Sequence, residues 1–113
     1  MILNDLEKTL IKQFLKKKSV SLQDEESFFS DLSVENRDFT GVGFFSGFKK
    51  SEKLKVGDIS KSYKWGDLGA KLNSSLDTGY LFYVENGYLI SIEGYTYAED
   101  WPESISEIEV YGI

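Results

Sequence analysis

The dipeptide Asn86-Gly87 constrains this chain more than any other feature, because it lies between two apolar runs, 79–85 and 88–93. Asn and Gly adopt positive φ angles at low energetic cost, and both central residues of a type I′ turn require them. The pattern therefore predicts a β-hairpin with a two-residue turn. We expect the rest of the fold to pack around this hairpin.

A two-residue turn fixes the strand register and places Val84 opposite Leu89 and Leu81 opposite Ile92. Side chains alternate between the faces of a strand, so the register also sorts the hairpin into two faces. One face would carry Leu81, Tyr83, Tyr88, Ile90 and Ile92, and the other Tyr80, Phe82, Val84, Leu89, Ser91 and Glu93. Apolar side chains on both faces are typical of a strand pair in the middle of a sheet.

An amphipathic helix is predicted over residues 4–18, because the apolar residues Leu6, Leu10 and Phe14 recur at helical spacing. Asn4, with Glu7 three residues later, has the pattern of a capping box. Residues 19–36 fit either a short helix or a short strand, and we favour the helix.

Strands are predicted over 37–48, 63–72 and 106–111, joined to the other elements by connections over 49–62 and 73–78. Together with the hairpin they give an antiparallel sheet of about five strands. With 113 residues the chain has the length of a single domain, 1–113. The predicted class is α+β, with the N-terminal helix packed on the sheet.

Two residue types are absent and limit the chemistry. Without histidine or cysteine, the chain cannot form a His-based catalytic triad or the usual zinc sites. We predict no catalytic residues, no metal site and no cofactor. The absence of cysteine favours a reducing cytoplasm, and no apolar run is long enough for a membrane span or a signal peptide.

The charges are unevenly distributed along the chain. All 13 Lys and Arg residues lie between Lys8 and Lys71, and the last 42 residues carry eight acidic side chains and no basic ones. Such a segment repels the phosphates of nucleic acids and membranes and attracts a basic partner. We therefore expect a protein partner with a basic surface, and neither nucleic acid nor membrane.

Three segments together resemble a family of small bacterial proteins: RDFTGVGFF at 37–45, GDLGAKL at 66–72, and the hairpin followed by IEGYTYAEDWPESI at 92–105. Some members of that family are encoded beside polymorphic or contact-dependent growth-inhibition toxins as immunity proteins. The resemblance covers roughly residues 37–105 and implies an α+β fold. It implies no catalytic residue.

The leading hypothesis is an immunity protein that binds a cognate toxin domain, for example a nuclease with a basic cleft. Tyr and Trp are favoured anchors of protein interfaces, and carboxylates pair with the partner's Lys and Arg. The predicted partner-binding residues are Asp77, Glu93, Tyr95, Tyr97, Glu99, Asp100, Trp101 and Glu103. Six of them, from Tyr95 to Glu103, crowd one loop after the hairpin.

Two other functions fit the sequence less well. A hydrolase could use paired carboxylates from Asp77, Glu85 and Glu93. A carbohydrate- or ligand-binding module could use Trp65 and Trp101 as stacking surfaces. A chain of 113 residues leaves little room to form the substrate cleft that a hydrolase needs. No export signal or disulfide supports the extracellular role expected of a carbohydrate-binding module.

Overall fold

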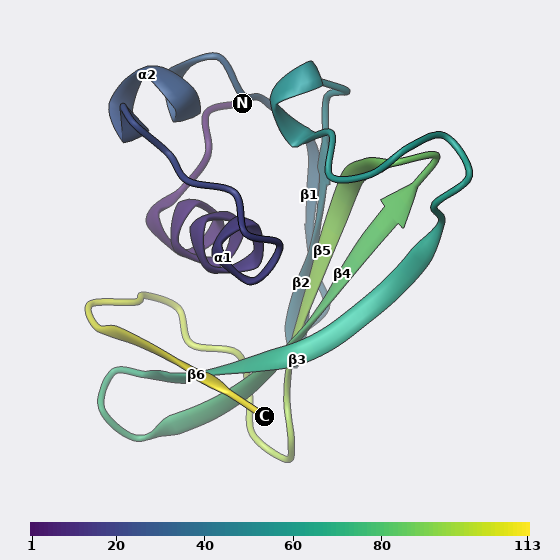
Figure 1. Ribbon diagram of the computed structural model, residues 1–113. Coiled ribbons are helices and arrows are strands. Elements are labelled where there is room, and N and C mark those ends of the chain that lie inside the picture. The colour runs from purple at the N-terminus through teal and green to yellow at the C-terminus, as the bar shows by residue number, and fades with distance from the viewer.

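The computed structural model describes residues 1–113 and has an α+β fold, as predicted (Figure 1). All strand pairs are antiparallel, in the order β1-β2-β5-β4-β3-β6. The sheet has six strands rather than about five. Their bounds are β1 Val34–Phe39, β2 Gly43–Phe48, β3 Tyr63–Leu72, β4 Leu76–Glu85, β5 Tyr88–Thr96 and β6 Ile108–Gly112.

The long helix α1 (Asp5–Lys17) covers one face of the sheet and supplies much of the core (Figure 1). Asn4 caps it, and the predicted capping box with Glu7 is present. The ring of Phe14 stacks on that of Phe82 in β4, with centroids 4.8 Å apart. This contact joins the apolar stripe of α1 to the centre of the sheet.

The ambiguous segment 19–36 contains helix α2 (Glu25–Ser30), capped by Asp24, and then enters β1 at Val34. The helix that we favoured there is confirmed. The connection 49–62 contains only one short 3₁₀ turn, η1 (Glu52–Leu54).

The additional strand comes from the segment 37–48, which was predicted as one strand. The structure divides it into β1 and β2, with Gly41 in the turn between them at a φ of 90°. The amide of Thr40 donates to the carbonyl of Gly43 and closes this turn. The predicted loop 73–78 is also too long, because β4 already begins at Leu76.

The central strands β4 and β5 pair with Glu85 opposite Tyr88 and Val84 opposite Leu89. Asn86 and Gly87 lie between them with φ angles of 51° and 87°.

Beyond Val84 the predicted register is wrong, because β5 has an irregularity between Leu89 and Ser91. The extra residue shifts the pairing by one position, so Phe82 faces Ile92, and Leu81 faces Glu93. A shift by one reverses the faces of the residues beyond it. Ile92 is therefore fully buried beneath α1, and Glu93 lies on the opposite face.

Candidate functional site

No helix covers the face of the sheet that points away from α1 (Figure 1). The side chain of Tyr80 is fully buried on the core side, and its ring lies near Gly94. Because side chains alternate along a strand, Leu81 and Tyr95 point the other way. We call this second surface the outer face. It is defined by Phe45, Asp77, Leu81, Tyr83, Glu93, Tyr95, Tyr97 and Tyr111.

In one row across the outer face, two neighbouring glycines lie between two tyrosines. Tyr95 of β5 is paired with Gly79 of β4, which is paired with Gly69 of β3 and then with Tyr111 of β6. A Cβ atom at Gly79 would lie 2.5 Å from Cζ of Tyr95, and one at Gly69 would lie 2.8 Å from a ring carbon of Tyr111. Both rings therefore lie over the backbone of neighbouring glycines, and the surface stays flat and aromatic.

Two carboxylates of the outer face accept hydrogen bonds from tyrosines. The hydroxyl of Tyr83 donates to Glu93 at 2.8 Å, and that of Tyr111 donates to Asp77 at 3.1 Å. The hydrogen bond to Glu93 raises the pKa of Tyr83. Burial, and then the hydrogen bond to Asp77, raise the pKa of Tyr111. The tyrosines thus remain neutral and hold the carboxylates in fixed positions on the strands.

The outer face carries an excess of negative charge. Asp38 is paired with Phe45, and Glu109 with Lys71, so the register puts these two carboxylates on the same face as Asp77 and Glu93. The register places two lysines there, Lys64 and Lys71. Lys71 forms an ion pair with Asp77 at 3.7 Å. Glu85, two residues beyond Tyr83 in β4, adds a further carboxylate to this face. The excess of negative charge favours a basic partner.

Four of the eight predicted partner-binding residues belong to the outer face. Asp77 and Glu93 supply charge, and Tyr95 lies in the tyrosine–glycine row. Tyr97 is 62% exposed, and its ring meets that of Tyr95 edge-on at 5.7 Å.

The other four predicted residues lie apart from the outer face. Trp101 turns to the core side, where its ring meets Phe44 at 5.1 Å and its amide donates to Gly41 at 2.8 Å. Glu103 lines a cavity beside the start of α1. Glu99 and Asp100 are exposed in the turn between the two groups.

Sequence reasoning missed Tyr83, Phe45 and Tyr111 as members of this surface. For Tyr111 a signal existed, since the predicted strand 106–111 put Ile108 and Val110 inward and therefore Tyr111 outward. Alternation already placed Tyr83 on the face of Leu81, but its hydrogen bond to Glu93 depends on the shifted register of β5. The place of Phe45 depends on the pairing of β2 with β5.

The residues of the two less favoured functions are placed as follows. Trp65 packs against Phe14 and Phe82 in the core, with centroids at 5.4 and 5.5 Å, so it does not offer a free stacking surface. Glu85 is exposed at the end of β4, beside the turn. No three Asp or Glu side chains lie close enough together to hold a metal ion.

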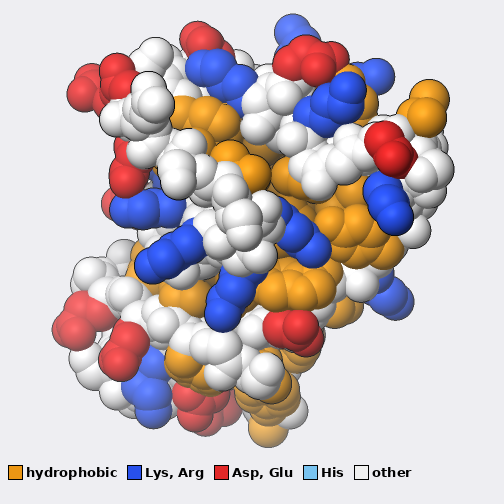
Figure 2. All heavy atoms as spheres, in the orientation of Figure 1, with side chains coloured by type: hydrophobic (Ala, Val, Ile, Leu, Met, Phe, Trp, Pro, Cys, Tyr) orange, Lys and Arg blue, Asp and Glu red, His pale blue; other side chains and the backbone are white.

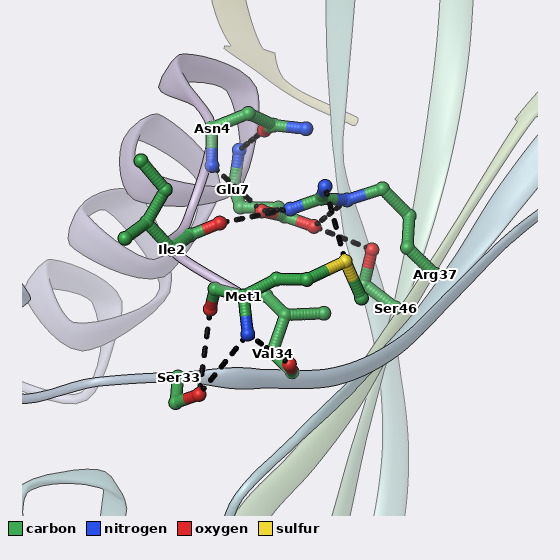
Figure 3. Close-up of polar contacts among 8 residues, drawn as sticks. All are labelled: Met1, Ile2, Asn4, Glu7, Ser33, Val34, Arg37 and Ser46. Carbon is green, nitrogen blue, oxygen red and sulfur yellow. Dashed lines mark hydrogen bonds and ion pairs between the residues drawn. The ribbon is translucent and has the colours of Figure 1, made fainter.

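One buried charge cluster joins α1 to the first hairpin (Figure 3). The carboxylate of Glu7 is fully buried and accepts from Arg37 of β1 at 2.6 and 2.9 Å. It also accepts from the hydroxyl of Ser46 at 2.6 Å and from the amide of Asn4 at 2.8 Å. Its hydrogen-bonding capacity is therefore filled, and we assign this cluster to stability rather than to chemistry.

Comparison of the chain with protein-family models, with curated proteins and with solved structures finds no match. No helix of the structure has both the length and the apolar character that a membrane crossing requires. Functional inference therefore depends on the surfaces of the chain itself and on the resemblance of its three sequence segments.

Proposed function

We propose that this chain is a cytoplasmic immunity protein, which binds and neutralises a cognate bacterial toxin domain through the outer face of its sheet. One observation carries the proposal. Tyrosines and carboxylates share an uncovered sheet surface, where Tyr95 and Tyr97 lie beside Asp77 and Glu93. The family resemblance supplies the class of partner.

The chemistry of the outer face suits a protein partner with a basic surface. Tyrosine buries a large ring at low entropic cost and keeps a polar end, which makes it a frequent interface anchor. Carboxylates around the rings would pair with Lys and Arg of the partner. A toxic nuclease must hold a polyanionic substrate, so its cleft offers such a surface.

Rigidity also favours the outer face over the loop that follows it. Its residues lie on paired strands, and hydrogen bonds hold Glu93 and Asp77 in place. A surface that is already ordered loses little conformational entropy on binding.

The basic side chains are concentrated elsewhere. Figure 2 shows Lys and Arg side chains gathered over the end of α1, whose last turn contains Lys16 and Lys17. This region lies on the helix side of the sheet, away from the outer face. A basic partner that approaches the outer face would therefore not meet the lysines of α1 directly.

In this proposal the protein acts by occupying the toxin's active site, and it performs no reaction of its own. It needs no cofactor and binds no nucleic acid. The test is to express the toxic domain encoded by the neighbouring upstream gene, with and without this chain, and to purify any complex. The proposal predicts restored growth and a stable one-to-one complex. Toxicity unchanged by this chain, with no complex formed, would contradict it.

A further inference from the structure

A second surface, on the opposite side of the sheet from the outer face, contains a cavity of about 330 Å³. It lies between the first residues of α1, the ends of β1 and β2, and the loop from 101 to 106, which passes below α1 in Figure 1. Pockets that bind small molecules begin at about this volume. The space is large enough for a compact group with one ring.

Three of the six apolar side chains that line this cavity are aromatic, namely Phe39, Phe44 and Trp101. Trp101 is held in place by its edge-on contact with Phe44 and by the hydrogen bond of its amide to Gly41. Phe39 is 66% exposed at the end of β1 and also lines the cavity. The faces of such rings attract cations as well as apolar groups.

The polar part of the cavity has a net negative charge. The one basic residue in the lining, Arg37, is already paired with the fully buried Glu7 through two hydrogen bonds. The two remaining charged residues, Asp5 and Glu103, take part in no ion pair. Two uncompensated carboxylates therefore stand beside two aromatic rings.

We propose that this cavity binds a small organic cation, in which an ammonium or guanidinium group is attached to an aromatic or branched apolar body. The apolar body would lie against Trp101 and Phe39, and the cation would lie between Asp5 and Glu103. The site does not depend on the outer face or on the toxin partner.

Three probes that share a phenyl ring and a two-carbon linker but differ in charge test this proposal by NMR titration of the folded full chain: 2-phenylethylamine, 2-phenylethanol and 3-phenylpropionate. The indole N–H signal of Trp101, identified by its loss in Trp101→Phe, should move with the amine. The amine should bind most tightly and 3-phenylpropionate most weakly. Equal binding of all three, tighter binding of 3-phenylpropionate, or no shift at Trp101 would overturn the proposal.

Two variants localise the charge dependence. Asp5→Asn and Glu103→Gln should each lower the affinity for 2-phenylethylamine about three- to fivefold, the effect of losing one partly exposed charge pair. Glu99→Gln removes the same charge two residues before Trp101, outside the cavity lining, so it should leave the affinity unchanged. If all three variants bind the amine equally, the carboxylates do not form the site.

A final arm distinguishes a free cation from a protein side chain. A short acetylated and amidated peptide with one arginine between glycines should bind no more tightly than 2-phenylethylamine. If the peptide moves the Trp101 signal and the free amine does not, the cavity is a contact for a protein partner and the proposal is wrong.

Discussion

The ring of Tyr95 lies across the backbone of Gly79 on the neighbouring strand, so that a Cβ atom at Gly79 would stand 2.6 Å from the tyrosine hydroxyl oxygen. This packing fixes the orientation of an aromatic side chain on a sheet face that no helix covers. It makes a glycine inside a central strand a requirement of the surface, although glycine weakens strands in general.

Gly79→Ala should therefore push the ring of Tyr95 off the outer face. Because the ring is partly exposed and able to swing outward, we expect a loss of only about 1 kcal/mol in the free energy of unfolding. Gly112→Ala is the control, since a Cβ there meets nothing within 4 Å. Urea unfolding gives the stability, and chemical shifts of Tyr95 report the displacement. An unmoved Tyr95 signal in Gly79→Ala would show that the ring does not lie over the glycine.

Gly87 and Gly41 provide a matched pair of turn glycines, with φ angles of 87° and 90°. A Cβ at Gly87 would lie 2.3 Å from the carbonyl oxygen of Gly57, whereas one at Gly41 would meet nothing within 4 Å. Both alanine variants have the same backbone strain, about 1–2 kcal/mol. Gly87→Ala should lower the free energy of unfolding by about 1–3 kcal/mol more than Gly41→Ala, because the backbone of residues 57 and 58 must move to admit the methyl group. Equal melting temperatures for the two variants would contradict the contact of this turn with residues 57 and 58.

The buried pair of Glu7 and Arg37 should contribute far more to stability than the exposed pair of Lys12 and Glu25. Glu7→Gln leaves the guanidinium without its counter-ion, in a site where the Arg37 side chain is only 18% exposed. We expect a loss of about 2–4 kcal/mol. Glu25→Gln removes a pair whose side chains are about half exposed, and should cost less than about 1 kcal/mol. Chemical unfolding gives the free energy of unfolding of both variants. Similar losses in the two would contradict the structural role assigned to Glu7.

Alkaline pH should destabilise the fold through Tyr80. Burial raises the pKa of its fully buried hydroxyl above the ordinary value of about 10, while the unfolded chain ionises normally. The stabilisation is therefore complete below pH 10 and is lost as the pH rises beyond it, by up to about 1.4 kcal/mol per pH unit. Tyr80→Phe should flatten this loss in unfolding curves between pH 8 and 11. A parallel decline of both proteins would contradict the assignment.

The parts of the fold that depend on neighbouring residues could be predicted from the sequence. The spacing of Asn4 and Glu7 is a local signal, and the structure contains the corresponding cap. The hairpin of β1 and β2 was missed because glycines 41, 43 and 47 look alike in the sequence. In the structure only Gly41 forms the turn, whereas Gly43 lets the backbone of Gly94 approach.

The site could be predicted only in part, because it depends on register and on long-range contacts. Glu93 faces outward because of the irregularity after Leu89. The alternation of apolar and polar residues in this strand gives no sign of that irregularity. Trp101 follows the last regular residue of β5 by five positions, so no periodicity sets its direction. Contacts with Gly41 and Phe44, about sixty residues earlier in the chain, turn it to the core side.

The central claim is that the outer face, and not the loop beyond it, holds the toxin. Two double variants with the same change in charge test it: Asp77→Asn with Glu93→Gln on the outer face, and Glu99→Gln with Asp100→Asn in the loop. The decisive measurement is the affinity of each for the toxin domain, by biolayer interferometry at low and at physiological salt. We expect the outer-face variant to bind about tenfold more weakly, with a smaller salt dependence, and the loop variant to bind like the unmodified protein. Full affinity in the outer-face variant, with weakened binding in the loop variant, would contradict the account.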